Sequence, residues 1–112
     1  MIRSRYIETP DGQLHVREWT PQSESRRPLL CLHPAPFSGL FYTTALHALG
    51  RERRVIAPDY PGYGGSPSRG AAPSVEDYAV SMLQCLTALD LDQGVDVLGF
   101  HSGALVLSLI HI

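Results

Sequence analysis

A histidine and a serine stand side by side between two glycines in residues 99–103, which read Gly-Phe-His-Ser-Gly. The run 95–99, which precedes them, predicts a short buried strand, and residues 102–106 begin an apolar helix, so the pair lies at a strand-to-helix turn. A sharp turn of this kind exposes the side chain at its vertex, where a serine hydroxyl or a neutral imidazole can attack an acyl carbon. This segment is therefore the candidate nucleophile site.

Two residues compete for the vertex of this turn, and two physical criteria disagree about them. Because the vertex is strained and crowded, the residues two positions before and after it must be small. With His101 at the vertex these positions hold Gly99 and Gly103, whereas Ser102 at the vertex places a phenylalanine at the first of them. Serine is nevertheless the more usual nucleophile. Steric considerations favour His101 and chemical ones favour Ser102, so both are candidate catalytic residues.

Two further segments of unusual composition also follow short apolar runs. Residues 33–36 read His-Pro-Ala-Pro, and residues 59–66 begin with an aspartate and continue into glycine, proline and serine. In an open parallel sheet the carboxyl ends of the strands meet at one edge, and ligands bind there. We therefore expect these two segments and residues 99–103 to form one site.

The elements that must position this site can be predicted from the spacing of apolar residues and from turn signals. We expect a β-hairpin over residues 5–19 with its turn at Asp11-Gly12, an exposed loop 20–28, strands 29–32, 54–57 and 95–99, and helices over 39–49, from Ser74 and from Ser102. Short continuous apolar runs are typical of parallel strands buried on both faces. A hairpin followed by alternating strands and helices indicates an α/β fold with a mostly parallel sheet in a three-layer αβα arrangement.

In these segments the chain resembles the α/β-hydrolase superfamily, in particular its esterase, lipase and peptidase-like branch. Residues 33–36 are similar to the family's H-G-x-P loop, with Pro34 where glycine is usual. Residues 99–103 stand where the family has its nucleophile elbow. The matched motif positions are His33 and Pro36 in the first segment, Asp59, Gly62, Gly64 and Ser66 of a D-x-x-G-x-G-x-S pattern in the second, and Gly99 in the third. The resemblance implies the N-terminal portion of an α/β-hydrolase fold.

The resemblance also implies a role for individual residues. The backbone N–H of Ala35 would stabilise the oxyanion of a tetrahedral intermediate, together with the N–H of the residue after the vertex, which is Ser102 or Gly103. His33 and Asp59 would be structural hydrogen-bonding residues rather than a metal ligand and the catalytic acid. In the family the catalytic acid and histidine follow the elbow, so we expect both beyond residue 112.

Composition restricts the partners and cofactors of the chain. A formal net charge of −2 gives no electrostatic reason to expect nucleic acid or an anionic membrane as a partner. Cys31 and Cys85 lie in apolar runs and are expected to be reduced packing residues, with no metal site. No G-x-G-x-x-G motif opens the first helix, so no cofactor is expected. The expected partner is a small-molecule acyl substrate, and the absence of a signal-peptide core predicts the cytoplasm.

Residues 107–112, Leu-Ser-Leu-Ile-His-Ile, are one translation of a common transposase sequencing adapter, CTG TCT CTT ATA CAC ATC. We interpret them as an adapter-derived tail and leave them out of the functional reasoning. Residues 1–106 are then expected to be the N-terminal part of a single α/β-hydrolase domain.

Two functions of different classes fit these observations. The first is a hydrolase that acts on an ester, amide or related acyl substrate through the elbow and an oxyanion hole. The second is a non-catalytic α/β-hydrolase-fold protein that binds a ligand in the same cleft, because His101 would be an unusual nucleophile at the vertex. Motif placement supports the first, and the steric preference for His101 supports the second.

We predict that the 112-residue chain expressed alone is insoluble or loosely folded, and inactive. The family's sheet continues beyond the strand that ends at Gly99, and an apolar strand left at a sheet edge favours aggregation. Soluble yield, a thermal melt and turnover of a p-nitrophenyl ester test this. A sharp cooperative melt together with turnover would contradict it.

Overall fold

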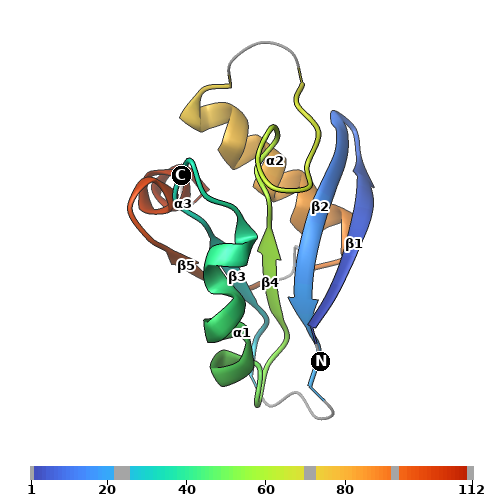
Figure 1. Ribbon diagram of the computed structural model, residues 1–112, viewed down its shortest axis with the longest axis vertical. Coiled ribbons are helices and arrows are strands. Elements are labelled where there is room, and N and C mark those ends of the chain that lie inside the picture. The colour runs from blue at the N-terminus through green and yellow to red at the C-terminus, as the bar shows by residue number, and fades with distance from the viewer. Residues whose placement is uncertain (1, 22–25, 70–72, 92–93, 111–112) are drawn as a thin grey trace.

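A computed structural model of the chain describes residues 2–21, 26–69, 73–91 and 94–110. Its elements in chain order are β1 (Ile2–Thr9), β2 (Gly12–Trp19), β3 (Leu29–Leu32), the 3₁₀ helix η1 (Gly39–Tyr42), α1 (Thr43–Leu49), β4 (Val55–Pro58), α2 (Val75–Ala88), β5 (Asp96–Gly99) and α3 (Ser102–Ile110). The strands form a single five-stranded sheet (Figure 1). The α1 helix lies on one face of this sheet, and α2 and α3 lie on the other. The predicted α/β fold class is confirmed.

The strand order is β1-β2-β4-β3-β5. Strand β2 pairs antiparallel with both β1 and β4, whereas β3 is parallel to β4 on one side and to β5 on the other. The carboxyl ends of β3, β4 and β5 therefore meet at one edge of the sheet. The three segments singled out in the sequence begin at these ends.

The predicted N-terminal hairpin is confirmed, with Thr9 paired to Gly12 across a two-residue turn. Gly12 has a φ of 127°, a backbone conformation that residues with a side chain rarely adopt. Alternation along β2 buries Leu14 and Val16 completely on one face of the strand. His15 and Arg17 alternate with these residues and point to the other face of the strand.

The segment predicted as one helix over 39–49 begins with the 3₁₀ turn η1 before it becomes α1. The Ser38 hydroxyl caps this turn by accepting a hydrogen bond from the N–H of Leu40 at 3.2 Å. Because a 3₁₀ turn advances each side chain by a larger angle than an α-helix, the apolar stripe shifts. Leu40, an apolar position of the predicted helix, is 60% exposed, whereas Tyr42 is buried.

Helix α2 starts at the predicted N-cap. The Ser74 hydroxyl accepts a hydrogen bond from the N–H of Asp77, and the Asp77 carboxylate accepts one from the N–H of Ser74 in return. This reciprocal capping box satisfies two amide groups that the helix itself leaves unpaired. Acidic residues in the first turn also interact favourably with the positive end of the helix dipole.

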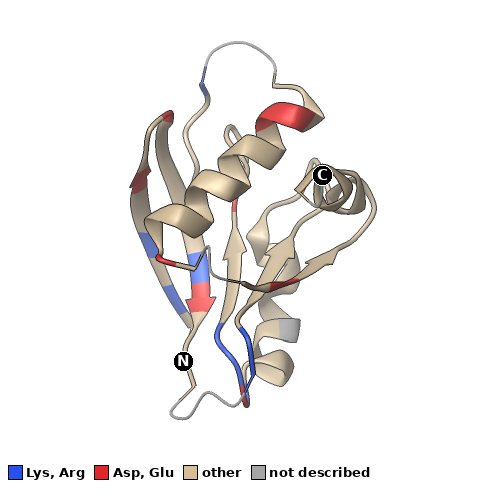
Figure 2. Cartoon of the chain, turned by 180° about the vertical axis from the view of Figure 1, so that it is seen from behind, with Lys and Arg blue, Asp and Glu red and all other residues tan. Residues whose placement is uncertain are grey.

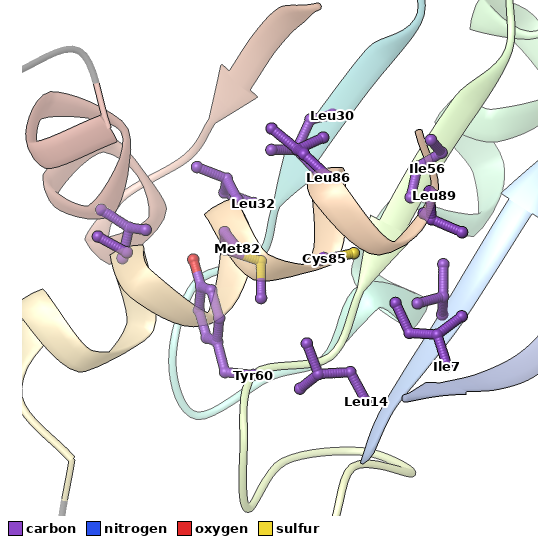
Figure 3. Packing of buried hydrophobic residues seen from close by; sticks show 13 residues of the cluster. Ile7, Leu14, Leu30, Leu32, Ile56, Tyr60, Met82, Cys85, Leu86 and Leu89 are labelled. Atoms are coloured by element: carbon purple, nitrogen blue, oxygen red, sulfur yellow. The ribbon is translucent and has the colours of Figure 1, made fainter. Parts of the chain in front are cut away.

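The core is divided between the two faces of the sheet. Figure 3 shows the larger cluster, in which α2 packs Met82, Cys85 and Leu86 against Leu30 and Leu32 of strand β3. The smaller cluster, beneath η1 and α1, contains Leu29, Cys31, Tyr42, Leu46, Val55 and Ala57. Cys31 and Cys85 are free and buried, as the sequence predicted. Burial raises the pKa of each thiol to about 12, so both are protonated at neutral pH.

Arginine residues gather where β3 and β4 begin, at the end of the sheet opposite the candidate site (Figure 2). Arg53 and Arg27 both pair with the Asp96 carboxylate, and Arg54 pairs with Glu18 at 2.8 Å. These ion pairs join the start of β5 to the residues that precede β3 and β4, and join the start of β4 to the end of β2. The carboxyl ends of the strands are therefore separated from most of the positive charge.

Strand β5 is at the edge of the sheet formed by the described residues, and its Leu98 is 40% exposed. An apolar edge strand of this kind is a surface on which another strand can pair. None of the helices in the described ranges is long and apolar enough to cross a bilayer.

We predict that Met82→Ala destabilises the protein by about 2–5 kcal/mol, because Met82 is fully buried where α2 meets β3. Val80→Ala on the same helix is the matched control, since Val80 is 46% exposed and its truncation should change stability by less than about 0.5 kcal/mol. Urea unfolding of the protein encoded by the full open reading frame that contains these residues measures both changes in stability. Equal losses in the two variants would show that α2 does not pack as described.

Candidate active site

The first and third segments, at the ends of β3 and β5, are in direct contact. The backbone N–H of Ala35 donates a hydrogen bond of 2.7 Å to the hydroxyl oxygen of Ser102. Ala35 lies in a turn that is closed by a hydrogen bond from the N–H of Phe37 to the carbonyl of Pro34, at 2.9 Å. This turn directs the Ala35 N–H toward the start of α3. The expected oxyanion donor and the candidate nucleophile segment therefore share one site.

His101 stands at the turn between β5 and α3 and is exposed. Its φ is 59°, in the left-handed region that a residue with a side chain enters only under strain. Ser102, by contrast, is the first residue of α3 and is partly buried. The strained backbone conformation is thus at His101.

Two glycines flank His101 at the positions where a side chain would collide with the backbone. A Cβ atom on Gly99 would lie 2.6 Å from the carbonyl oxygen of Gly103. A Cβ atom on Gly103 would overlap the carbonyl oxygen of Leu32 at the end of β3. Phe100, in contrast, is 58% exposed, so its position is not crowded. The requirement for small residues falls on the neighbours two positions from His101.

His33 is fully buried and braces the first segment. Its Nε2 accepts a hydrogen bond from the N–H of Tyr60 at 3.0 Å, so Nδ1 carries the proton and donates to the carbonyl of Pro34 at 2.9 Å. Burial lowers the pKa of His33 and outweighs the Pro34 hydrogen bond and the Asp59 charge, which raise it. This neutral ring ties the end of β3 to the residues that follow β4, and both nitrogens are already used.

Asp59 is the most heavily hydrogen-bonded side chain among the described residues of the site, and it is fully buried. It accepts hydrogen bonds from the N–H of Gly39 at 2.6 Å and of Gly65 at 2.8 Å. His15 Nδ1 lies 2.9 Å away, and the Arg17 guanidinium makes an ion pair of 2.8 Å. All four partners are protein groups, so the carboxylate acts as a structural acceptor in this arrangement.

These contacts also set the ionisation of Asp59. Burial raises the pKa of the carboxyl, but the hydrogen bonds from Gly65, Gly39 and His15 and the charge of Arg17 together hold that pKa below its usual range. The carboxylate is therefore ionised at neutral pH.

The remaining residues of the second segment wrap around Asp59. Gly62 and Gly64 have φ values of 84° and 52°, and a Cβ atom on Gly64 would overlap the Asp59 carboxylate. The Ser66 hydroxyl donates to the carbonyl of Asp59 at 2.7 Å and accepts from the N–H of His15 at 2.9 Å. The loop is thereby fastened to strand β2.

Sequence reasoning missed three residues that support the site. His15 and Arg17 point to the same face of β2, and their alternation was visible in the sequence, but nothing local indicated Asp59 as their partner. Tyr42 was not singled out either. Its hydroxyl donates to the carbonyl of Leu32 at 2.7 Å, and burial raises its pKa to about 12. Tyr42 therefore fixes η1 to the end of β3.

The described residues contain no group of three or more His, Cys, Asp or Glu side chains that could hold a metal ion. The available chemistry is that of a backbone N–H donor facing an exposed histidine and a serine. His111, the one histidine that follows the elbow in the sequence, lies outside the described residues, as does Ile112 of the adapter-like tail. Residues 107–110 of that tail continue α3.

We predict that Asp59→Asn destabilises the protein by about 3–5 kcal/mol at neutral pH, because it leaves Arg17 without its buried partner. The folded-state pKa of Asp59 is below the unfolded value of about 3.9. Its stabilisation is therefore complete above that pH and is lost as the pH falls through the folded-state pKa. The difference in the free energy of unfolding between wild type and variant should shrink by about 1 kcal/mol between pH 7 and pH 3.

Urea unfolding across this pH range measures the difference. Glu76→Gln is the matched control, because it removes an exposed carboxylate and should have little effect at either pH. A difference between Asp59→Asn and wild type that stays constant down to pH 3 would contradict the assignment of a low pKa.

Solved structures of three hydrolases are similar to this chain. Among solved structures, a variant of the N-acyl homoserine lactonase AidH complexed with N-hexanoyl homoserine matches at 30% identity and a TM-score of 0.86, over 98% of this chain and 40% of that one. The epoxide hydrolase CorEH matches at 25% identity and a TM-score of 0.85, over 97% of this chain and 37% of that one. Proline iminopeptidase from Mycobacterium smegmatis matches at 27% identity and a TM-score of 0.83, over 96% of this chain and 38% of that one. A search of curated protein sequences found no match.

The chain spans about 40% of the length of the lactonase and slightly less of the other two hydrolases. A sequence profile described as "Alpha/beta hydrolase family" matches residues 29–111, which include all three segments of the site. This match covers well over half of the chain, and the similar structures share its hydrolase-type fold. The chain therefore belongs to the alpha/beta hydrolase family.

Proposed function

We propose that this chain supplies the nucleophile elbow and the oxyanion hole of a hydrolase that acts on an ester, amide or related acyl substrate. The observation that carries the proposal is the 2.7 Å hydrogen bond from the N–H of Ala35 to the Ser102 hydroxyl. It places a fixed amide donor beside the turn that presents the nucleophile. Amide donors held in this way stabilise the charge that develops on an acyl oxygen.

We assign the vertex of the elbow to His101. Its positive φ and the crowding at Gly99 and Gly103 support this register, because a nucleophile elbow needs a strained vertex with small residues two positions away. In this register the second oxyanion donor is the backbone N–H of Ser102. Ser102 as the nucleophile is the alternative, with the N–H of Gly103 as the second donor.

In the proposed reaction the neutral imidazole of His101 attacks the acyl carbon, and the carbonyl electron pair moves to its oxygen. That oxyanion accepts hydrogen bonds from the N–H groups of Ala35 and Ser102, once the Ser102 hydroxyl rotates away from Ala35. Collapse breaks the bond to the leaving group, which takes up the proton released from the other nitrogen of the acylated imidazole and departs as the alcohol or amine, so that a neutral acyl-imidazole remains. Water then hydrolyses this acyl-imidazole to the carboxylic acid and frees His101.

The activities of two similar proteins support an acyl substrate. One is an N-acyl homoserine lactonase and the other a proline iminopeptidase, so their reactions cleave an ester and an amide bond. We propose a small-molecule acyl substrate and no nucleic-acid or membrane partner. We also place the protein in the cytoplasm, which is consistent with the free, buried thiols of Cys31 and Cys85.

A second function is favoured by one specific observation. The usual nucleophile, serine, lies one residue past the strained position, and its hydroxyl is held by the Ala35 N–H. A protein in which His101 does not react would keep the cleft and the donor and would bind a ligand without turnover. This is the non-catalytic alternative.

Four proteins test the proposal. They are the protein encoded by the full open reading frame that contains these residues, and its His101→Ala, Ser102→Ala and His101→Ser variants. Hydrolysis of a p-nitrophenyl ester should fall by about 10³-fold or more in His101→Ala and persist in Ser102→Ala. The His101→Ser variant should react with a fluorophosphonate probe, because it places a hydroxyl at the vertex beside the Ala35 donor.

The other outcomes separate the alternatives. Activity and labelling that are lost in Ser102→Ala but kept in His101→Ala would assign the nucleophile to Ser102 and overturn the His101 register. No turnover by the wild type, together with labelling of His101→Ser, would favour the non-catalytic alternative. No reaction in any of the four proteins would overturn the oxyanion-hole assignment as well.

A further inference from the structure

The three phenylalanines of the chain, Phe37, Phe41 and Phe100, form one exposed cluster. Their exposed fractions are 57%, 44% and 58%. The Phe41 ring lies 5.8 Å from that of Phe37 and is stacked on Phe100 at 5.6 Å. Single exposed apolar residues are common on protein surfaces, but contiguous exposed aromatic rings mark a binding surface. We call these three residues the phenylalanine cluster.

This cluster extends along the candidate active site. The N–H of Phe37 closes the turn that directs the Ala35 N–H toward Ser102. Phe100 immediately precedes His101 at the strained position. Phe41 joins the two, so the rings form a continuous apolar row from the oxyanion donor to the elbow.

A hollow of about 370 Å³ lies beside this row. It is lined by Pro36, Phe37, Ser38, Leu40, Phe41 and Gly64, none of which carries a charge. Its volume is within the range of small-molecule pockets, about 300–1,000 Å³. The uncharged lining favours an apolar group over an ionic one, because an ion would lose its hydration there without gaining a partner.

The cluster rests on a fixed support. The Phe41 ring meets the Tyr42 ring edge-on at 5.1 Å, and Tyr42 is 4% exposed. The Tyr42 hydroxyl is bonded to the carbonyl of Leu32 at the end of β3. Since Phe41 directly precedes this anchor in the chain, the cluster is held in place before a ligand binds, which lowers the entropy cost of binding.

We propose that the phenylalanine cluster and the adjoining hollow bind the apolar carbon chain or ring of the acyl substrate. The inference rests on the proposed function, because it takes Ala35 and the elbow as the position of the acyl carbon. The substrate class is therefore an ester or amide of an apolar acid, such as a medium-length alkanoyl group. Continuity of the aromatic row with the oxyanion donor argues for substrate over a segment of protein as the occupant.

The test uses two independent measurements, one of binding and one of kinetics, on the protein encoded by the full open reading frame. N-methyl alkanamides of two to eight acyl carbons, which are neutral and slowly hydrolysed, are titrated calorimetrically. Affinity should rise about three- to fourfold per methylene until the hollow is filled. The kcat/KM values for p-nitrophenyl esters of the same acyl groups should rise in parallel.

Phe41→Ala should flatten both chain-length series, so that the octanoyl compounds lose about tenfold or more while the acetyl compounds change little. Leu83→Ala is the matched control, because Leu83 is also 44% exposed but lies on α2, away from the cluster. It should leave both series unchanged. Circular dichroism melts show that both variants are folded.

The remaining outcomes distinguish a failure of the proposed subsite from a failure of the proposed function. Amide binding that depends on chain length and on Phe41, without turnover of any ester, would overturn the proposed function but support the subsite. Turnover that is independent of chain length and of Phe41 would support the function and overturn the subsite. If no amide binds and a Phe41→Cys thiol resists maleimide in the folded protein, other residues cover the cluster and the inference is wrong.

Discussion

The buried carboxylate of Asp59 is the interaction on which the arrangement of the site depends. It joins three parts of the chain: strand β2 through His15 and Arg17, the start of η1 through Gly39, and the glycine-rich loop through Gly65. A buried charge is tolerated only when its hydrogen bonds are satisfied. The loops therefore have to close around this group in one arrangement, and that arrangement fixes where η1 begins.

The constraint extends from Asp59 to the reactive edge of the sheet. The next residue, Tyr60, donates its N–H to His33, which in turn holds the carbonyl of Pro34. The Ala35 turn is thus braced through backbone and ring contacts. Preorganised donors need no rearrangement when charge develops on a substrate, which is the condition under which they lower an activation barrier. In the proposed hydrolase, the structural residues around Asp59 would therefore contribute to catalysis through the position of Ala35.

Local signals in the sequence were sufficient for most of the fold. The hairpin around Gly12, the strand before His33 and the Ser74 cap were all predicted, because turn preferences, apolar runs and capping depend on neighbouring residues. The spacing of small residues also indicated which residue of the elbow would be strained. These features need no knowledge of distant contacts.

The features that sequence reasoning missed all depend on tertiary contacts. The ion pair of Arg17 with Asp59 spans 42 positions, and the stack of Phe41 on Phe100 joins η1 to the turn after β5. The 3₁₀ start of η1 follows from the bonds that Ser38 and Gly39 make, since Asp59 holds the Gly39 N–H at 2.6 Å. Helical periodicity alone could not show this shift, which leaves Leu40 exposed and buries Tyr42.

The elbow shows how packing and chemistry can select different residues. To present Ser102 at the vertex, the turn would have to move by one position. Phe100 would then occupy the place now held by Gly99, where a Cβ atom lies 2.6 Å from a carbonyl oxygen. The close contact of Gly103 with Leu32 holds the start of α3 against strand β3 and opposes this one-residue shift of the turn. Steric constraints in the backbone thus choose the position that is exposed, and the side chain found there, His101, sets what chemistry the site can do.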